Sequence, residues 1–468
     1  MNSVVVRATF AGIVTAAIVW ALVLGWWQAN DFSPSTSDLL LYLVGIPLSL
    51  LLGYWLLRGF IEHLGKPVTV GEAGTPDLPL DDDPLAPARK VSEAAARQFS
   101  LLLLDAMIET AAGQSGEEVL TALQSGKRPG PSDDLVDGQG FPVFAAVIPD
   151  LETESLAERL DATPDMANLL ERPAGLRLLA MLDRVASRLE SSLEDRSAGK
   201  VLRVIWIVPA EWVQGELPAL RGWLQTNYWQ AFSAPPPELL IVPASSSGEV
   251  LQKLDDEIVR ANRSTMDNEL IALIGAVSNI DQQIIDHWSD HGRLFGPEAQ
   301  DGEIPGEAAV ALLLTKAGAS NSDAGSTVTL GRIAQGRRDK RLDAGGRVSG
   351  QLVEALFADV LGISGISHQE VGSLVLDADH RSRQLAEAMA GGGEALAHLE
   401  PVEDVLPSGS VSGSIDPIGP LVALACARAR VLADTRPALC LSNHAPLERA
   451  ALLVKPVPAD TQPESENT

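Results

Sequence analysis

The sequence predicts an α/β protein in which two similar α/β halves follow a two-helix transmembrane hairpin. Three observations lead to this fold class. Two uncharged apolar runs stand at residues 8–30 and 39–57. After residue 90, short apolar runs typical of strands alternate with amphipathic runs typical of helices. The same order of strands and helices occurs twice, and each copy closes with two strands. Such alternation predicts parallel sheets that helices cover on both faces.

The composition favours a large folded part with an acidic surface. The chain has 468 residues, of which 46% are hydrophobic, and a formal net charge of −27. An acidic surface repels phosphate backbones, so nucleic acid is not an expected partner. Cys426 and Cys440 belong to no Cys/His cluster, so we expect no zinc site and interpret both as buried apolar residues. No cofactor or metal site is predicted.

The first predicted element is a membrane anchor over residues 1–66. Each apolar run is long enough to cross about 30 Å of hydrocarbon. Arg7, Arg58 and Lys66 flank the pair of runs, whereas the loop between the runs has no Lys or Arg. Because basic residues stay on the cytoplasmic side, both ends of the hairpin are expected in the cytoplasm. The large domain is therefore expected there too, tethered to the membrane.

The rest of the chain divides into three segments. Residues 67–90 are rich in Pro, Gly and acids and are interpreted as a flexible linker. Residues 91–456 carry the α/β pattern, with halves at about 91–318 and 325–456. Residues 457–468 are predicted to be a disordered tail.

In the first half, the spacing of apolar residues predicts both kinds of element. The expected helices cover residues 91–112, 174–195 and 217–226, and the expected strands cover 143–148, 201–208, 269–277 and 308–316. Between them, "ELLIVPASSSGEVLQKLDDEIVRA" at 238–261 predicts a strand, a turn and a helix.

The second half repeats this pattern. Strands are expected at 328–334, 373–377, 402–406, 438–442 and 449–454, and helices at 350–361, 382–390 and 417–433.

One stretch of the first half resembles a known family. The strand "ELIALIGA", the turn "GAVSNI" and the turn "DGEIPGEAA" follow one another within residues 269–309. This order resembles β-ketoacyl synthases, members of the thiolase superfamily. The resemblance implies a duplicated thiolase-like domain with α-β-α-β-α layers. It also implies that Pro305 and Gly306 make the tight turn into the closing strand. Glu307 would then be a structural acid that anchors loops where the two halves meet.

The catalytic residues of that family do not all have counterparts here. The family nucleophile is a cysteine at the start of the helix just before the "ELIALIGA" strand. The matching position is near Ser245, and the first half contains no cysteine. The first family histidine falls at Asp379 or His380. The second falls near Gly413, where no imidazole stands.

Two interpretations of Ser245 and His380 remain open. Ser245 can act as a nucleophile at a helix N-terminus, where backbone N–H groups stabilise an oxyanion and His380 or His444 is the base. Alternatively, Ser245 or a neighbouring serine caps the helix, and His380 pairs with the acids beside it.

A basic cluster, "GRRDKR" at 336–341, has two interpretations as well. It contacts an anionic headgroup or an acidic partner, or it is a solvated loop.

The combination of a degenerate synthase-like domain and an N-terminal membrane segment resembles a second family. It is the adaptor family encoded beside lipase effectors of the bacterial type VI secretion system. The resemblance implies a non-catalytic, multi-pass inner-membrane adaptor that binds a lipase effector for loading onto the secretion spike. One alternative is an acyl-thioester transferase that uses Ser245. Another is a scaffold that binds acyl carrier protein. A homodimer is also open, since synthase-like folds are typically dimers.

Overall fold

The computed structural model describes residue 20 and residues 86–161, 172–210, 217–229, 232, 235–317 and 324–457. Apart from Trp20, the predicted membrane runs at 8–30 and 39–57 lie outside the described residues. Within the described part of the chain, no helix is both long and apolar enough to cross a membrane. The chain separates into two compact units, Met1–Ala88 and Arg89–Thr468. The second unit carries the α/β fold.

A mixed sheet forms the framework of the second unit, and its strand order occurs twice. The first half has the order β5-β4-β6-β7-β1 and the second half has the order β11-β10-β12-β13-β8. The first set comprises β1 (Leu101–Thr110), β4 (Val201–Pro209), β5 (Glu238–Ala244), β6 (Glu269–Ser278) and β7 (Glu307–Lys316). The second set comprises β8 (Val328–Leu330), β10 (Ser373–Leu376), β11 (Val405–Pro407), β12 (Ala438–Ser442) and β13 (Glu448–Pro456).

The strand directions are duplicated as well. In each half the outer three strands are parallel, and the strand that closes the half runs antiparallel to both of its neighbours. The halves join where β1 pairs with β8, with Leu101 opposite Leu330 and Leu103 opposite Val328. The predicted duplication is therefore confirmed.

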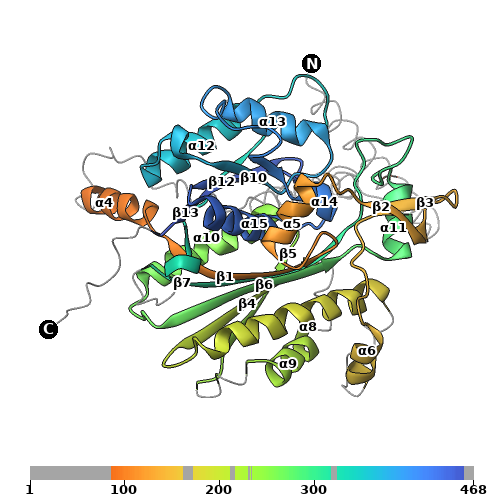
Figure 1. Cartoon of the computed structure of the whole chain (residues 1–468), viewed down its shortest axis with the longest axis horizontal. Coiled ribbons are helices and arrows are strands. Elements are labelled where there is room, and N and C mark those ends of the chain that lie inside the picture. Colours follow the sequence, from red (N-terminus) through yellow and green to blue (C-terminus); the bar gives the residue numbers. More distant parts are fainter. Residues whose placement is uncertain are drawn as a thin grey trace, which may run out of the picture. The chain divides into compact units, whose positions relative to one another are not determined.

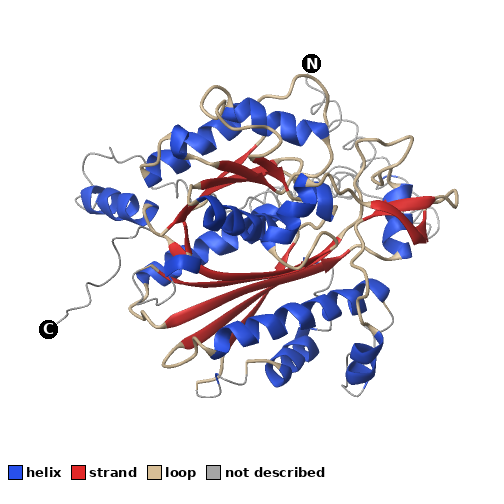
Figure 2. Ribbon diagram, in the orientation of Figure 1, coloured by secondary structure: helices blue, strands red, loops and turns tan. Residues whose placement is uncertain are grey.

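Helices cover both faces of each set of strands, which gives five layers (Figures 1 and 2). The first outer layer contains α8 (Pro173–Glu194) and α9 (Leu217–Asn227), and the second contains α12 (Gln351–Ser364) and α13 (Ser382–Gly392). Between the two sets of strands lie α5 (Gly116–Gln124), α10 (Ser247–Arg263) and α15 (Gly419–Asp434). The central α15 contacts strands of both halves, including β7 and β12. The α-β-α-β-α layering predicted by the resemblance is confirmed.

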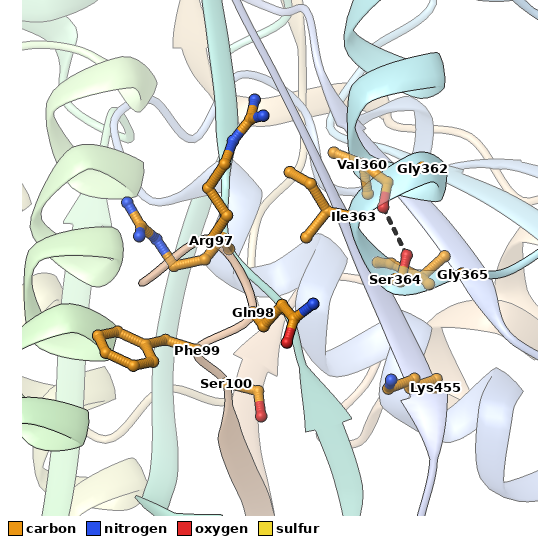
Figure 3. Close-up of a pocket in the computed structure, with 13 residues that line it drawn as sticks. Arg97, Gln98, Phe99, Ser100, Val360, Gly362, Ile363, Ser364, Gly365 and Lys455 are labelled. Atoms are coloured by element: carbon orange, nitrogen blue, oxygen red, sulfur yellow. Dashed lines mark hydrogen bonds between the residues drawn. The ribbon is translucent and has the colours of Figure 1, made fainter. Parts of the chain in front are cut away.

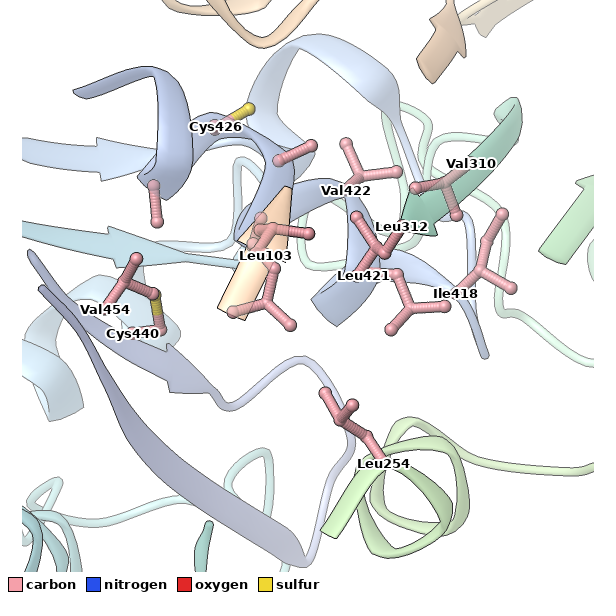
Figure 4. Close-up of a cluster of buried hydrophobic side chains, with 14 of the residues drawn as sticks. Leu103, Leu254, Val310, Leu312, Ile418, Leu421, Val422, Cys426, Cys440 and Val454 are labelled. Atoms are coloured by element: carbon pink, nitrogen blue, oxygen red, sulfur yellow. The ribbon is translucent and has the colours of Figure 1, made fainter. Parts of the chain in front are cut away.

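The largest apolar core surrounds these central helices (Figure 4). Leu254 of α10 and Leu421 of α15 pack there with strand residues such as Leu312. Cys426 and Cys440 belong to the same core as free thiols, which confirms that both are buried. Burial raises the pKa of Cys426 to about 12 and also raises that of Cys440, so both stay protonated at neutral pH.

The remaining described elements are not on this strand path, although one short strand among them, Ala334–Arg337, also pairs with β13 of the main sheet. They are α4 (Ala86–Arg97), the hairpin of β2 (Gly130–Val136) and β3 (Pro142–Ala145), α6 (Glu154–Asp161), α11 (Gln282–Asp290), β9 (Ala334–Arg337), α14 (Gly409–Ser412) and two short 3-10 turns, Ala324–Ser326 and His368–Glu370. The hairpin strands pair only with each other, so the strand predicted at 143–148 is not part of the main sheet.

Three sequence expectations were wrong. The helix expected at 91–112 ends at Arg97, and residues 101–110 form β1, because that apolar run is buried on both faces between β7 and β8. The sheet is mixed rather than parallel, since the five-residue loop between β12 and β13 is too short for a crossover. The single strand expected at 328–334 is two strands, β8 and β9, which pair with different parts of β13.

Candidate functional site

Two adjoining cavities lie where the C-terminal ends of strands from the two halves meet. The larger, of about 590 Å³, is lined by Ser245 and by Asn279 just after β6. The smaller, of about 150 Å³, is lined by His444 just after β12. Arg293 and Asp416 line both cavities. In α/β sheets, ligands bind in crevices outside the carboxyl ends of the strands, so this region is the candidate functional site.

The first candidate residue, Ser245, precedes the N-terminus of α10. Its neighbour Ser246 is the helix cap, because the Ser246 hydroxyl accepts a hydrogen bond from the Glu249 amide at 3.3 Å. The Ser245 amide donates to the Glu249 carboxylate at 2.6 Å. Ser245 itself is exposed, and within the described residues no histidine is bonded to its hydroxyl. The general base that a serine nucleophile needs is therefore not in contact with Ser245.

Two carboxylates from the second half cover the same helix end. The Ser247 amide and hydroxyl donate to Asp416 Oδ1 at 3.1 Å and 2.5 Å. The Ser246 hydroxyl donates to Glu448 Oε2 at 2.8 Å. Glu448 lies so close that a Cβ on Gly248 would come within 2.3 Å of its Oε2. The backbone N–H of Ser247, which in an open helix end is free to bind an oxyanion, is thus bonded to a carboxylate of the chain itself.

The predicted structural acid, Glu307, opens β7 and is fully buried. Its carboxylate accepts hydrogen bonds from Arg177 of α8 at 2.8 Å and 2.5 Å. It also accepts from the Ile148 amide at 2.8 Å and from the Ser278 hydroxyl at 2.9 Å. One side chain therefore ties an outer helix, the end of β6 and the segment after β3 to the start of β7.

The turn before Glu307 lies against the loop that precedes α15. Pro305 forms a parallel bridge with Ser414, whose amide donates to the Ile304 carbonyl at 2.7 Å. A Cβ on Gly306 would lie 2.1 Å from the Ser412 carbonyl oxygen. Only glycine allows the two backbones to approach this closely. The 305–307 turn is thus one of the places where the two halves touch.

The second candidate residue, His380, packs its ring edge-on against Phe295, with centroids 4.9 Å apart. Its Nε2 is buried and, among the described residues, has no hydrogen-bond partner. His380 lines neither of the two cavities in their described parts. The structure therefore does not bring Ser245 and His380 together as a nucleophile and its base.

His444 lies in a buried ionic group at the wall of the smaller cavity. Its Nε2 is 3.3 Å from Asp379 Oδ2 and 3.0 Å from Arg381 Nη2. Burial lowers the pKa of His444, but the hydrogen bond and charge of Asp379 outweigh burial and raise it to about 9. In the same group, Arg381 and protonated His444 lower the pKa of Asp379 well below its usual range, against the effect of burial.

A second acid, Glu303, contributes to the same wall from the first half. It forms a two-point ion pair with Arg293, at 3.0 Å and 2.9 Å, and accepts from the Ser414 hydroxyl at 2.7 Å. Burial acts to raise the pKa of Glu303, whereas Arg293, His444 and Arg381 lower it to about 2. Sequence reasoning missed Glu303, Arg293 and Asp416, because nothing local in the sequence marks residues that only the tertiary fold brings together.

The basic cluster at 336–341 is partly engaged within the protein. Arg338 points inward and pairs with the fully buried Glu387, which also binds Arg449 at 2.7 Å. Arg341 pairs with Asp343 at 2.8 Å, and Lys340 is exposed. The cluster is therefore not a uniformly free basic surface.

A third cavity, of about 550 Å³, lies between the α4–β1 connection and the C-terminal end of α12 (Figure 3). Two of its cations are already paired, Arg97 with Asp359 and Arg332 with Asp255. It contains none of the candidate residues, so we do not assign the function there.

Solved structures similar to the chain include ketosynthases. Among them is an oxazolomycin ketosynthase domain from Streptomyces albus JA3453, with 15% identity, a TM-score of 0.51 and coverage of 78% of this chain and 75% of that one. The ketosynthase of module 1 of the bacillaene synthase from Bacillus amyloliquefaciens FZB42 has 14% identity, a TM-score of 0.50 and coverage of 78% and 77%.

A third similar structure is a type II polyketide synthase acyl carrier protein in complex with its ketosynthase. It has 11% identity, a TM-score of 0.50 and coverage of 77% of this chain and 100% of that one. At such identities the likeness establishes the fold alone, which is thiolase-like and shared with ketosynthases. No protein-family model and no curated protein matches the chain.

Proposed function

We propose that the chain is a non-catalytic adaptor of ketosynthase fold, anchored in a bacterial inner membrane, that binds a protein partner. The partner proposed is a lipase effector that the adaptor holds for loading onto the type VI secretion spike. The anchor follows from the two uncharged runs at 8–30 and 39–57. The choice of partner rests on the resemblance of the whole layout to the adaptor family.

The observation that carries the non-catalytic part is the closed N-terminus of α10. The position that matches the ketosynthase nucleophile holds an exposed serine that, among the residues described, has no histidine bonded to its hydroxyl. The helix end beside it is bonded to Asp416 and Glu448 at 2.5–3.1 Å. An oxyanion formed here would meet two carboxylates in place of free N–H donors, so it would be repelled. This arrangement does not favour acyl transfer by Ser245.

The test is genetic and biochemical in the native host. The gene is deleted, and secretion of each neighbouring lipase effector is measured. The full chain with an affinity tag is then returned, and the proteins that co-purify from solubilised membranes are identified. We expect deletion to abolish secretion of one effector and that effector to co-purify. Unchanged secretion of every effector would overturn the adaptor proposal. Co-purification of acyl carrier protein instead would point to the scaffold alternative.

Complementation separates binding from catalysis. A Ser245→Ala variant is expected to restore secretion fully, because the proposed function needs no nucleophile. A Gly306→Ala variant is the contrasting control, since it should disturb the contact between the halves and restore secretion less fully. If Ser245→Ala failed although the variant reached the membrane at normal level, Ser245 would have a chemical role and the non-catalytic proposal would be wrong.

A further inference from the structure

Two histidines stand on successive turns of α11, beside the larger cavity. They are His287, within the helix, and His291, its C-terminal cap, in the sequence "HWSDH". Residues four apart lie on the same helix face. Their ring centroids are 4.2 Å apart, with an angle of 43° between the ring planes. His287 also lines the 590 Å³ cavity.

A backbone contact determines which nitrogen of His291 is free. His291 Nδ1 lies 2.7 Å from the His287 carbonyl oxygen. A carbonyl oxygen only accepts hydrogen bonds, so Nδ1 must carry the hydrogen of the neutral ring. The lone pair is then on Nε2, which is available to a metal ion. Metal-binding histidines are commonly held in this way, with the second ring nitrogen donating to a backbone carbonyl.

The surroundings of the pair favour a cation. Asp286 and Asp290 are exposed on the same helix, each next to one of the histidines. The nearest cation in the sequence, Arg293, is engaged elsewhere: it pairs with Glu303 and lies 4.3 Å above the Trp288 ring. Asp286 and Asp290 therefore add negative charge beside the imidazoles.

We propose that His287 and His291 form a two-imidazole site for a transition-metal ion of the class that imidazole prefers, Cu²⁺, Ni²⁺ or Zn²⁺. In the described part of the chain, no group of three or more His, Cys, Asp or Glu side chains is placed to hold a metal. The protein thus supplies two ligands, and water fills the other positions. The site contains no cysteine, and it does not depend on the proposed adaptor function.

The test uses the full chain, purified in detergent with a tag free of histidine. Cu²⁺ and Zn²⁺ are titrated separately by calorimetry in a buffer that does not chelate metals. His287→Asn and His291→Asn are compared with His368→Asn, which removes another exposed histidine. Because all three side chains are exposed, the variants should fold normally, and circular dichroism verifies that.

We expect one Cu²⁺ per chain, bound more tightly than Zn²⁺. Affinity should fall at least about tenfold in either α11 variant and stay unchanged in His368→Asn. The electron paramagnetic resonance spectrum of bound Cu²⁺ should show nitrogen ligands that are lost in the His287→Asn, His291→Asn double variant. Equal affinity in the double variant and the native chain, or no saturable binding at all, would overturn the proposal. Either result would leave the adaptor proposal untouched.

Discussion

Removing the carboxylate of the buried acid Glu307 is expected to destabilise the protein strongly. Its carboxylate is fully buried and accepts four hydrogen bonds, two of them from Arg177. A Glu307→Ala change leaves the guanidinium unpaired and takes the acceptor from the Ile148 amide and the Ser278 hydroxyl. Breaking a buried ion pair by removing one partner costs about 3–5 kcal/mol.

The unsatisfied donors do not add their full cost to that figure. Each lost buried partner costs about 1–3 kcal/mol by itself, but such costs are not additive for groups in one network. Water can also enter the space that the shorter side chain leaves. We therefore expect the free energy of unfolding to fall by about 3–5 kcal/mol, a large part of the 5–15 kcal/mol typical of a folded protein.

The assay is a urea titration of the full chain, with pulse proteolysis to report the unfolded fraction. The matched control is Asp343→Asn, which breaks the pair with Arg341, where both side chains are more than half exposed. Exposed pairs contribute about 0–1 kcal/mol, so this variant should unfold near the native midpoint. If Glu307→Ala shifted the midpoint no more than Asp343→Asn does, the buried network around Glu307 would not stabilise the first half in this way.

Three further outcomes follow from the same site. The pKa of His444 is raised to about 9 in the folded protein, whereas that of an unfolded histidine is about 6.5. The protonated imidazole therefore stabilises the fold fully below pH 6.5, and this stabilisation is lost as the pH rises through 9. The gap between native and His444→Asn urea midpoints should therefore narrow from pH 6.5 to pH 10. Gly306→Ala should destabilise by about 1–3 kcal/mol, because its Cβ would lie 2.1 Å from the Ser412 carbonyl oxygen. Gly130→Ala, with open space around it, should change the midpoint little in the same titration. In a Ser245→Cys variant, the pH dependence of alkylation by iodoacetamide should give the new thiol an ordinary pKa of about 8.5. A thiol pKa below about 7.5 would contradict the closed helix end.

The fold could be predicted well wherever local patterning was unambiguous. The long amphipathic helix expected at 174–195 is α8, Pro173–Glu194, because its apolar face repeats over many turns. The strand expected at 269–277 is β6, Glu269–Ser278. β1 was missed for the opposite reason: a continuous apolar run is compatible with a buried helix and with a strand, and only its neighbours β7 and β8 decide between them.

The candidate site could be predicted only where it is local in sequence. The turn at 305–307 stands out because proline, glycine and an acid are adjacent before an apolar strand. The partners of the α10 serines could not be found in that way. Asp416 lies 169 residues beyond Ser247, and Glu448 lies 202 residues beyond Ser246. They meet only because the fold brings the loop before α15, which holds Asp416, and the start of β13, which holds Glu448, to the N-terminus of α10.

The closed N-terminus of α10 links the contact between the two halves to the proposed absence of catalysis. A helix N-terminus carries a partial positive charge and free N–H groups, so it attracts an anion. In this chain the anions are internal, since Glu249 comes from the helix itself and Asp416 from the other half. A new thiol at position 245 would gain no help from the helix end, because these carboxylates cancel the charge that lowers a thiol pKa. Restoring a cysteine alone would therefore not restore a reactive site; the carboxylate of Asp416 would have to leave the N–H of Ser247 first.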